Sequence, residues 1–436
     1  MDWKKTLLQK IADRRAVVGI VGLGYVGLPL VFRFLEVGFR VVGFDVDERK
    51  VEMLHRGEGY IAHLDVSGLP AQATAGNFRA TSDFSLASQV DAVLLCVPTP
   101  LNRNREPDLS FVMQSTLAVL PHMTPGSLLS LESTTYPGTT EELLRPAVEK
   151  RGFRIGEDFF LVFSPEREDP GNKGFSTHTI PKVCGGTTPA CLEVGCALYS
   201  GVIEKVVPVS STAAAEMTKI LENTYRAVNI ALVNELKMVA DRMGLDIFEV
   251  IKAAATKPFG FAPFFPGPGL GGHCIPIDPF YLTWKAREYD INTRFIELAG
   301  EVNTSMPDYV IHKVIHALNH HRKPVKGSRI LLLGIAYKKN VDDMRESPSL
   351  LLMERLLGLG AEVDYADPHV PSLRATRAYD FRKQSVAVGE DVSSYDCVLV
   401  ATDHDLFDWD LICRKARLIV DARGRFVADG NRIWRA

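Results

Sequence analysis

The sequence predicts an α/β fold in which two doubly wound lobes are joined by a central helical domain with one long helix. Two observations support this prediction. Strand-sized apolar runs alternate with helix-length segments over residues 1–208 and again over 322–436, which is typical of parallel sheets covered by helices. Between them, residues 209–321 are mostly helical in pattern and include a long Ala-, Glu- and Leu-rich amphipathic stretch. We therefore expect three domains with these bounds, of which the outer two are Rossmann-like.

The composition narrows the class of protein. Of the 436 residues, 46% are apolar and 24% are charged, which is typical of globular chains and argues against disorder. Fifty Lys and Arg against 53 Asp and Glu leave a formal charge of −3, so a nucleic-acid partner is not expected. No apolar run approaches the ~18 residues of a membrane span, and the first residues lack a secretory apolar core. A cytoplasmic protein without a membrane partner is expected.

The first lobe opens with a strand, a tight turn, a helix and a second strand over residues 16–45. Further strands are expected at 92–97, 127–131 and 159–163, because each is a short apolar run bounded by polar or amphipathic segments of helix length. The opening is thus the βαβ unit of a parallel sheet.

The turn in this unit has the pattern GxGxxG at Gly22, Gly24 and Gly27, and Asp45 ends the second strand. In such turns one glycine makes the bend, one lets the backbone approach a pyrophosphate and one packs helix on strand, while the helix N-terminus offers free N–H groups. The alternative is a glycine turn needed only for packing. An acidic residue at this place accepts a hydrogen bond from the adenosine ribose 2′-hydroxyl, so NAD is expected over NADP. The nearby Arg49 and Lys50 could weaken that preference. The residues expected to bind NAD here are Gly22, Gly24, Tyr25, Val26, Gly27, Asp45 and Lys50.

A long helix is expected from Ser210 to about Met243, because cap-forming residues open the amphipathic stretch and Gly244 closes it. Its apolar stripe suits a dimer interface, although burial within one subunit explains the stripe equally well. A Gly- and Pro-rich segment at 258–279 is too apolar for a linker, and more helix is expected after it, up to about His320.

In the last lobe, strands are expected at 329–333, 362–365, 397–401 and 418–420. Gly334 stands where the first lobe has its glycine turn, but the rest of the triplet is missing. Only the first lobe is therefore expected to bind a pyrophosphate.

The seven cysteines are odd in number and lack CxxC pairs or the Cys and His spacing of zinc sites, so neither a disulfide framework nor a metal site is expected. Most are expected to be reduced core residues. Cys274 differs because it lies in GLGGHCIPIDP, where glycines allow close approach of a ligand. A thiol needs a lowered pKa to attack a carbonyl, and neighbouring His273 or a lysine could supply it. A buried structural cysteine is the equal alternative.

Lys219 and Asn223 are four residues apart and therefore share one face of the expected long helix. A cation and an amide so placed could stabilise an alkoxide or thiohemiacetal oxyanion. The alternative is a solvated polar face, and the residues alone do not decide between the two.

Seven motifs follow one another along the chain, and together they resemble one enzyme family. They are VGLGYVGLPL with Asp45, CVPTP, ESTTYPG, FSPERE, KILEN, GGHCIPIDP and KKNVDDMRES. The family is that of the UDP-glucose/GDP-mannose dehydrogenases, which oxidise nucleotide sugars at C6 from alcohol to acid with two NAD. Within it, PGPGLGGHCIPIDPFYLTW and SPEREDPGN are most similar to the branch that acts on UDP-N-acetylhexosamines, in particular the UDP-N-acetylglucosamine 6-dehydrogenases of surface-polysaccharide pathways.

The resemblance implies roles for the catalytic candidates. Cys274 matches the nucleophile that traps the C6 aldehyde as a thiohemiacetal, which hydride loss converts to a thioester. Lys219 and Asn223 match the pair that stabilises the oxyanion, and Asp278 matches an acid/base residue held near a water. An ordinary turn residue before Pro279 is the alternative for Asp278.

The resemblance also assigns residues to water and to the two ligands. Thr134 and Glu166 match residues that position or activate water for thioester hydrolysis; the alternatives are a helix cap for Thr134 and a salt bridge to Arg167 for Glu166. Thr99, Thr134 and Arg345 match NAD contacts. The residues expected to bind the substrate are Glu166, Lys219, Asn223, Phe265, Gly267, Gly269, Gly271, Lys338 and Arg423, where Lys338 and Arg423 supply the cations that a diphosphate requires and are otherwise ordinary surface charges.

Two positions depart from the UDP-glucose enzymes of the family. Pro170 stands where many of them have a second glutamate, and Pro258 stands where they have an arginine before the cysteine loop. These departures fit an N-acetylated sugar.

The first hypothesis is therefore a homodimeric, NAD-dependent enzyme that oxidises UDP-N-acetylglucosamine to UDP-N-acetylglucosaminuronate for surface-polysaccharide precursors. The same chemistry on UDP-N-acetylmannosamine or UDP-glucose is the close rival. A two-electron dehydrogenase of the β-hydroxyacid type, in which Cys274 has no role, and an inactive NAD-binding scaffold are hypotheses of other classes.

Overall fold

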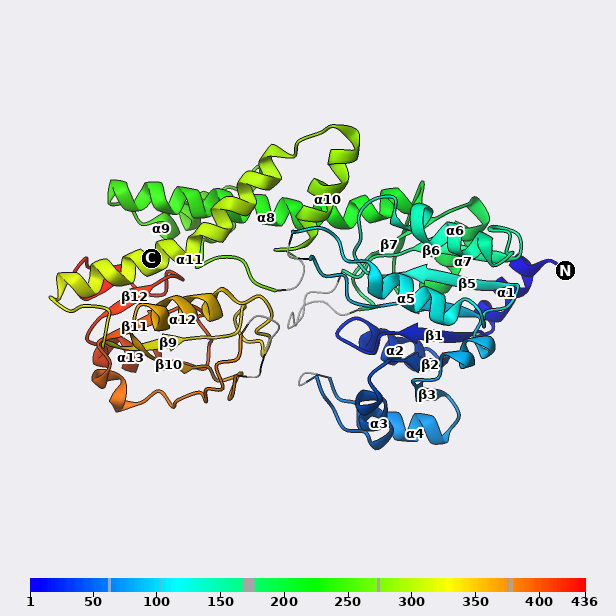
Figure 1. Ribbon diagram of the computed structural model, residues 1–436, viewed down its shortest axis with the longest axis horizontal. Coiled ribbons are helices and arrows are strands. Elements are labelled where there is room, and N and C mark those ends of the chain that lie inside the picture. The colour runs from blue at the N-terminus through cyan, green and yellow to red at the C-terminus, as the bar shows by residue number, and fades with distance from the viewer. Residues whose placement is uncertain (62–63, 103, 168–176, 273–274, 374, 376–378) are drawn as a thin grey trace. The chain divides into compact units, whose positions relative to one another are not determined.

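The computed structural model describes the chain except for residues 62–63, 103, 168–176, 273–274, 374 and 376–378. It contains two compact units. Unit 1 comprises Met1–Glu222 and Trp284–Ile291, and unit 2 comprises Asn223–Thr283 and Asn292–Ala436. The boundary falls inside the long helix α8, Thr212–Met243, which Figure 1 draws as one unbroken helix. The division into domains 1–208, 209–321 and 322–436 stays a prediction.

Unit 1 is built on one eight-stranded sheet with the order β3-β2-β1-β4-β5-β6-β7-β8. All neighbours are parallel except β6 and β7. The run from β3 to β6 has the strand order of the dinucleotide-binding Rossmann fold, as predicted. Its strands are β1 Val17–Val21, β2 Arg40–Phe44, β3 Phe78–Thr81, β4 Ala92–Leu95, β5 Ser127–Leu131, β6 Phe159–Phe163, β7 Lys182–Gly186 and β8 Val206–Val209.

Helices pack against this sheet because this removes their apolar faces from water. Leu30, Val31 and Phe34 of the second helix are fully buried in the core of unit 1, together with Val18 and Ile20 of β1. The helices of unit 1 are α1 Trp3–Ala12, α2 Gly27–Glu36, α3 Glu48–Arg56, α4 Leu69–Thr74, α5 Ser110–Val119, α6 Arg145–Lys150 and α7 Pro189–Ser200, with short turns of helix at Phe84–Gln89, Thr140–Leu144 and Arg287–Tyr289.

Unit 2 contains a five-stranded, fully parallel sheet with the order β10-β9-β11-β12-β13, the second common doubly wound order. The predicted strands of the last lobe are confirmed to within one residue at each end. The strands are β9 Arg329–Leu333, β10 Glu362–Ala366, β11 Cys397–Val400, β12 Ile419–Asp421 and β13 Ile433–Arg435, and the helices outside α8 are α9 Ile247–Ala254, α10 Asp278–Ala286, whose end crosses into unit 1, α11 Arg294–His320, α12 Pro348–Gly358 and α13 Trp409–Lys415, with a short 3₁₀ turn at Glu390–Ser394.

Helix α8 ends at Met243 as predicted and begins at Thr212, two residues after the predicted start at Ser210. Ser211 precedes it and its hydroxyl accepts from the Ala214 N–H at 3.1 Å, which satisfies a first-turn donor. Gly244 ends it with φ of +71°, a left-handed conformation that glycine adopts without strain. Among the helices that the structure describes, none is long and apolar enough to cross a membrane.

Candidate active site

The three glycines of the turn in unit 1 have different surroundings. Gly22 has φ of +95°, and a Cβ there would lie 2.5 Å from the carbonyl oxygen of Cys96. A Cβ on Gly27 would lie 1.9 Å from the carbonyl oxygen of Gly22. A Cβ on Gly24, in contrast, would meet no protein atom within 4 Å. Packing explains Gly22 and Gly27 but not Gly24, whose backbone stays open to a ligand.

The N-terminus of α2 and the end of β2 complete this cradle. Val26, the N-cap of α2, provides no side-chain acceptor, so first-turn N–H groups of the helix are left for a phosphate. Asp45 is 6% exposed and accepts from the N–H of Leu23 at 3.0 Å and from Lys50 Nζ at 3.1 Å. The carboxylate thus lies against the turn, where an adenosine ribose hydroxyl is bound in this fold, and the residues present fit NAD.

Of the other predicted NAD contacts, Arg345 lies in unit 2 and the rest lie in unit 1. Tyr25 and Val26 are half-buried in the turn and pack against the core of unit 1, and Thr99 is buried in the segment after β4. Arg345 belongs to unit 2, where its guanidinium pairs with Asp343 at 2.7 Å.

The equivalent turn of unit 2 is filled by protein groups. Gly334 has φ of +83°, like Gly22, but the next two N–H groups, of Ile335 and Ala336, both donate to Oδ2 of Asp367, at 2.7 and 2.9 Å. His404 Nε2 lies 3.0 Å from the same oxygen. No N–H of Ile335 or Ala336 is therefore left for a phosphate, so this turn lacks the open backbone N–H groups of the glycine turn in unit 1.

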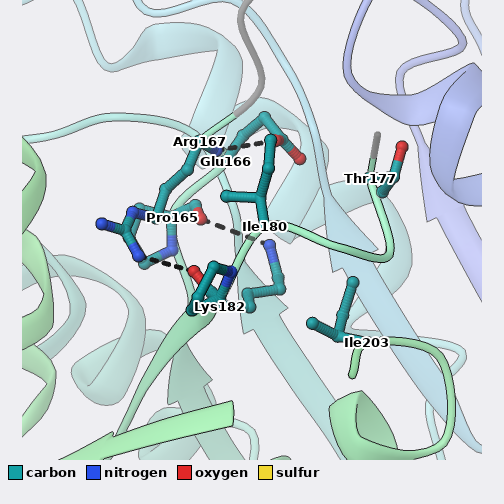
Figure 2. A pocket seen from close by; sticks show the side chains of 8 residues that line it. Pro165, Glu166, Arg167, Thr177, Ile180, Lys182 and Ile203 are labelled. Carbon is teal, nitrogen blue, oxygen red and sulfur yellow. Dashed lines mark hydrogen bonds between the residues drawn. The ribbon is translucent and has the colours of Figure 1, made fainter. Parts of the chain in front are cut away.

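Glu166 lines a small pocket of unit 1 (Figure 2). The pocket is formed by Pro165, Glu166, Arg167, Thr177, Ile180, Pro181, Lys182 and Ile203. Glu166 Oε1 accepts from the backbone N–H of Arg167 at 2.6 Å, whereas the Arg167 guanidinium pairs with Glu222 of α8 at 2.5 Å. The predicted water-positioning partner, Thr134, is half-buried just after β5, and no helix begins at it.

Beneath Glu166 lies a buried ion pair that sequence analysis missed. Lys182 Nζ contacts Glu132 Oε2 at 2.5 Å, and the two side chains are 5% and 0% exposed. Tyr199 donates its hydroxyl to the other Glu132 oxygen, and Lys182 also donates to the Pro165 carbonyl at 3.3 Å. Burial raises the pKa of Glu132. Burial by itself would lower the pKa of Lys182, but the attraction of Glu132 and Glu166 together exceeds that effect, so the pKa of Lys182 is raised. The pair ties the end of β5 to the residue before Glu166.

Lys219, the predicted oxyanion-stabilising cation, lies on α8 in unit 1 and is 8% exposed. Within the described parts of the chain, no hydrogen bond or ion pair engages its ammonium. A cation that is nearly buried and unpaired is costly unless a ligand compensates it, which suits a substrate-binding role.

In unit 2 the structure brings two predicted residues together that are 55 positions apart. Asn223 Nδ2 donates to Asp278 Oδ2 at 2.5 Å, and each residue is 2% exposed. Arg226 donates to Asn223 Oδ1 at 3.3 Å, which fixes the amide with its NH₂ toward the carboxylate. Asn223 therefore orients Asp278, the first residue of α10. Cys274, its neighbour His273 and Pro170 lie outside the described residues.

The loop before the cysteine packs within unit 2. Phe265 stacks on Phe248, with ring centroids 6.5 Å apart. Gly269 has φ of +133°, and a Cβ on Gly271 would lie 2.5 Å from Cβ of Tyr337. These two glycines are needed for the turn and for close contact with protein, beyond any contact with a ligand.

The predicted substrate cations of unit 2 differ in their surroundings. Arg423 donates from Nε to the Ala401 carbonyl at 2.5 Å, and its Nη1 would lie 2.7 Å from a Cβ on Gly267 of the cysteine loop. Burial lowers the pKa of Arg423. Lys338 is half-buried in the turn after β9.

Comparison with known proteins identifies the family. Profiles of the UDP-glucose/GDP-mannose dehydrogenase family match the NAD-binding domain at residues 16–203, the central domain at 213–305 and the UDP-binding domain at 331–435. The chain belongs to this family. It is therefore an NAD-dependent nucleotide-sugar dehydrogenase with a UDP-binding domain, and the predicted family, fold class and cofactor are confirmed.

Individual members of the family show how far the similarity extends. The chain is 36% identical to UDP-N-acetyl-D-glucosamine 6-dehydrogenase of Pseudomonas aeruginosa, over 89% of this chain and 91% of that protein. It is 34% identical to UDP-N-acetyl-D-mannosamine dehydrogenase of Methanococcus maripaludis, over 91% and 90%. The solved UDP-D-ManNAc dehydrogenase of Pyrococcus horikoshii superposes with a TM-score of 0.86 at 29% identity, over 96% of this chain and 98% of that one.

The remaining cysteines fit the predicted core role. Cys96, Cys184, Cys191 and Cys397 are free and buried, and Cys196 and Cys413 are free and half-buried. In the described part of the chain, no three His, Cys, Asp or Glu side chains gather as metal ligands would.

Proposed function

We propose that the enzyme oxidises UDP-N-acetyl-D-glucosamine at C6 to UDP-N-acetyl-D-glucosaminuronate, for surface-polysaccharide precursors. The CH₂OH carbon gives up two hydrides, one to each of two NAD, and gains one oxygen from water, while three protons are released. The observation that carries this proposal is the similarity over 89% of the chain to a UDP-N-acetyl-D-glucosamine 6-dehydrogenase.

Cys274 is proposed as the nucleophile. After the first hydride transfer, its thiolate adds to the C6 aldehyde to give a thiohemiacetal; the second hydride transfer gives a thioester, and water releases the acid and the thiol. Covalent capture keeps the aldehyde in the site between the two oxidations. Lys219 and Asn223 are proposed to stabilise the oxyanion. The ammonium of Lys219 supports this, because it is nearly buried and pairs with no described residue.

Three carboxyl and hydroxyl groups are proposed to handle protons and water. Asp278 is the acid/base residue, and its support is the bond from Asn223, which holds the carboxylate in one orientation. Thr134 and Glu166 position the water that hydrolyses the thioester, and Thr134 also contacts NAD.

Ligand binding is proposed to use both predicted sets of residues. Thr99 and Arg345 are proposed to contact NAD, in addition to the residues of the glycine turn. Arg423 and Lys338 bind the diphosphate of the substrate, and the backbone of Phe265–Gly271 lines its site. The placement of Arg423 against Gly267 supports this assignment.

The reaction and the sugar are tested together by counting NADH per sugar consumed, with limiting UDP-N-acetylglucosamine, UDP-N-acetylmannosamine or UDP-glucose. Two NADH per UDP-N-acetylglucosamine, and slower turnover of the others, are expected. Two NADH from UDP-N-acetylmannosamine alone would transfer the proposal to that sugar. One NADH per sugar would refute the four-electron reaction and favour a simple alcohol dehydrogenase. Cys274→Ser is expected to bind both ligands but to stall before the acid is released. Acid production at the wild-type rate would refute the role of Cys274.

A homodimer through α8 is proposed as well. In unit 2 this helix exposes Tyr225, Leu232, Leu236, Val239 and Met243, each between 43% and 66% exposed. Their spacings of seven, four, three and four place them on one stripe, as in helices that pair. By light scattering we expect twice the mass of one chain for the wild type and for a control, Leu406→Glu, and one chain for Leu236→Glu. A monomeric wild type would refute the dimer.

A further inference from the structure

Lys237 of α8 is a buried lysine that takes no part in the proposed reaction. It is 1% exposed, and its one hydrogen bond to a described residue runs from Nζ to the carbonyl of Gly267, at 3.4 Å. The ring of Tyr309 on α11 lies 5.3 Å from Nζ. Asn234, one turn earlier on α8, accepts from the N–H of Gly267 at 3.0 Å. The N–H and the carbonyl of Gly267 are therefore both held by buried side chains of α8.

The carboxylates near Lys237 are already engaged by other cations. Asp241 on α8 pairs with Lys313 of α11 at 2.5 Å and accepts from the Tyr309 hydroxyl at 2.8 Å. Asp421 at the end of β12 pairs with Arg435 at 3.0 Å. Within the described residues, no carboxylate is left to form an ion pair with Lys237.

A second cation, Arg423, increases the excess positive charge beside Gly267. Arg423 packs its guanidinium against Gly267, on whose carbonyl Lys237 lies. Burial, with the repulsion from Arg423 next, lowers the pKa of Lys237 to about 7, and Lys313 adds to that repulsion while Asp421 and Asp241 oppose it. Among the described residues, no carboxylate forms an ion pair with Lys237 or Arg423, and two such cations side by side favour the binding of an anion.

We propose that Lys237 is a positioning residue of the UDP-sugar site, which holds the Gly267 loop and takes up a proton from solvent when a diphosphate binds at Arg423. This inference rests on the proposed role of Arg423. The two negative charges of the ligand offset the field of Arg423, so the charged form of Lys237 becomes favourable. The ammonium then donates a stronger, charge-assisted bond to the Gly267 carbonyl, and the loop is fixed in the ligated state.

The direction of the pH effect follows from linkage. If binding takes up a proton, the affinity for the UDP-sugar falls as pH rises through about 7, while the free enzyme loses the proton. The diphosphate of a UDP-sugar is a diester without a titrating group near neutral pH, so the proton is gained by protein. NADH binding, which occurs at the glycine turn, is expected to keep its affinity over the same pH range.

The test is calorimetry of UDP-N-acetylglucosamine binding at pH 7, with NADH present in place of NAD to prevent turnover, in two buffers of different ionisation enthalpy. For the wild type we expect uptake of roughly half a proton per site, since a group with pKa near 7 is then about half protonated. Lys237→Met and Lys237→Arg are expected to bind with uptake near zero, the first because no proton can be gained and the second because the charge is permanent. Lys252→Met, at an exposed lysine of α9, should keep the wild-type uptake.

The outcomes separate this inference from the function on which it rests. Binding of the sugar without proton uptake, or uptake that persists in both Lys237 variants, would overturn the role of Lys237 and leave the enzymatic activity standing. If Lys237→Met fails to fold, Lys237→Arg decides on its own. If the wild type binds and oxidises no UDP-sugar, the proposed function is refuted and the inference with it.

Discussion

The buried ion pair between Glu132 and Lys182 leads to a quantitative prediction. Lys182→Met leaves the Glu132 carboxylate buried with no cation at 2.5 Å, in a place where neither partner exceeds 5% exposure. Removing one member of such a pair costs about 3–5 kcal/mol, because the remaining charge has lost its partner and cannot reach water. Each kcal/mol lowers the melting midpoint of a domain of 150–250 residues by about 2–4 °C. We therefore expect the transition of unit 1 to fall by about 6–20 °C.

A double variant tells charge from packing. Glu132→Gln with Lys182→Met removes both charges and keeps an acceptor for the Tyr199 hydroxyl, so most of the lost stability should return. The assay is differential scanning calorimetry of the three proteins at equal concentration, with Lys4→Met, at a half-exposed surface pair, as the control. A midpoint shift below about 2 °C for Lys182→Met, or a double variant no more stable than the single one, would refute the reasoning.

Three further predictions concern the ligand-binding and catalytic residues. Gly24→Ala should fold normally, because its Cβ meets no protein atom within 4 Å, but it should bind NAD about tenfold more weakly in a titration. Gly27→Ala should fail to fold, because its Cβ would lie 1.9 Å from a carbonyl oxygen. Equal behaviour of the two variants would contradict this assignment. Asp45→Ala should lower NAD affinity about tenfold and narrow the difference from NADP, and an unchanged ratio of the two affinities would remove Asp45 from the ribose site. Asn223→Ala should lower kcat about 10- to 100-fold and leave the NAD affinity unchanged, because Asp278 loses a hydrogen bond worth about 1.5–3 kcal/mol. A wild-type kcat would show that Asn223 does not orient Asp278 for catalysis.

Elements defined by local pattern were predictable from the sequence. Ser127–Leu131 and Phe159–Phe163 are strands with the predicted bounds because every residue in them is buried, and such strands are mainly apolar along their whole length. The helix Thr212–Met243 was equally clear from its caps. The edge strands Phe78–Thr81 and Val206–Val209 were not predicted, because Arg79 and Pro208 break their apolar pattern and only pairing with a neighbour makes them strands.

The candidate site was predictable only in part. The spacing of Gly22, Gly24 and Gly27 predicts the NAD turn because all its contacts are local. The bond between Asn223 and Asp278 joins residues 55 positions apart, so only the family resemblance linked them. Lys182 and Lys237 gave no signal, because a lysine in sequence is most simply interpreted as solvated, and only the tertiary structure buries it.

The two glycine turns also predict that ligand-linked stability differs between the units. In unit 2, Asp367 saturates the N–H groups after Gly334, so that turn is complete within the protein. In unit 1, the N-terminus of α2 has no side-chain cap, and the cofactor is the group that fits it. At a hundred times its Kd, a ligand adds about 2.7 kcal/mol to the unit that binds it. Cofactor depletion should therefore expose unit 1 to proteases first, and the supply of NAD would influence the lifetime of the enzyme as well as its rate.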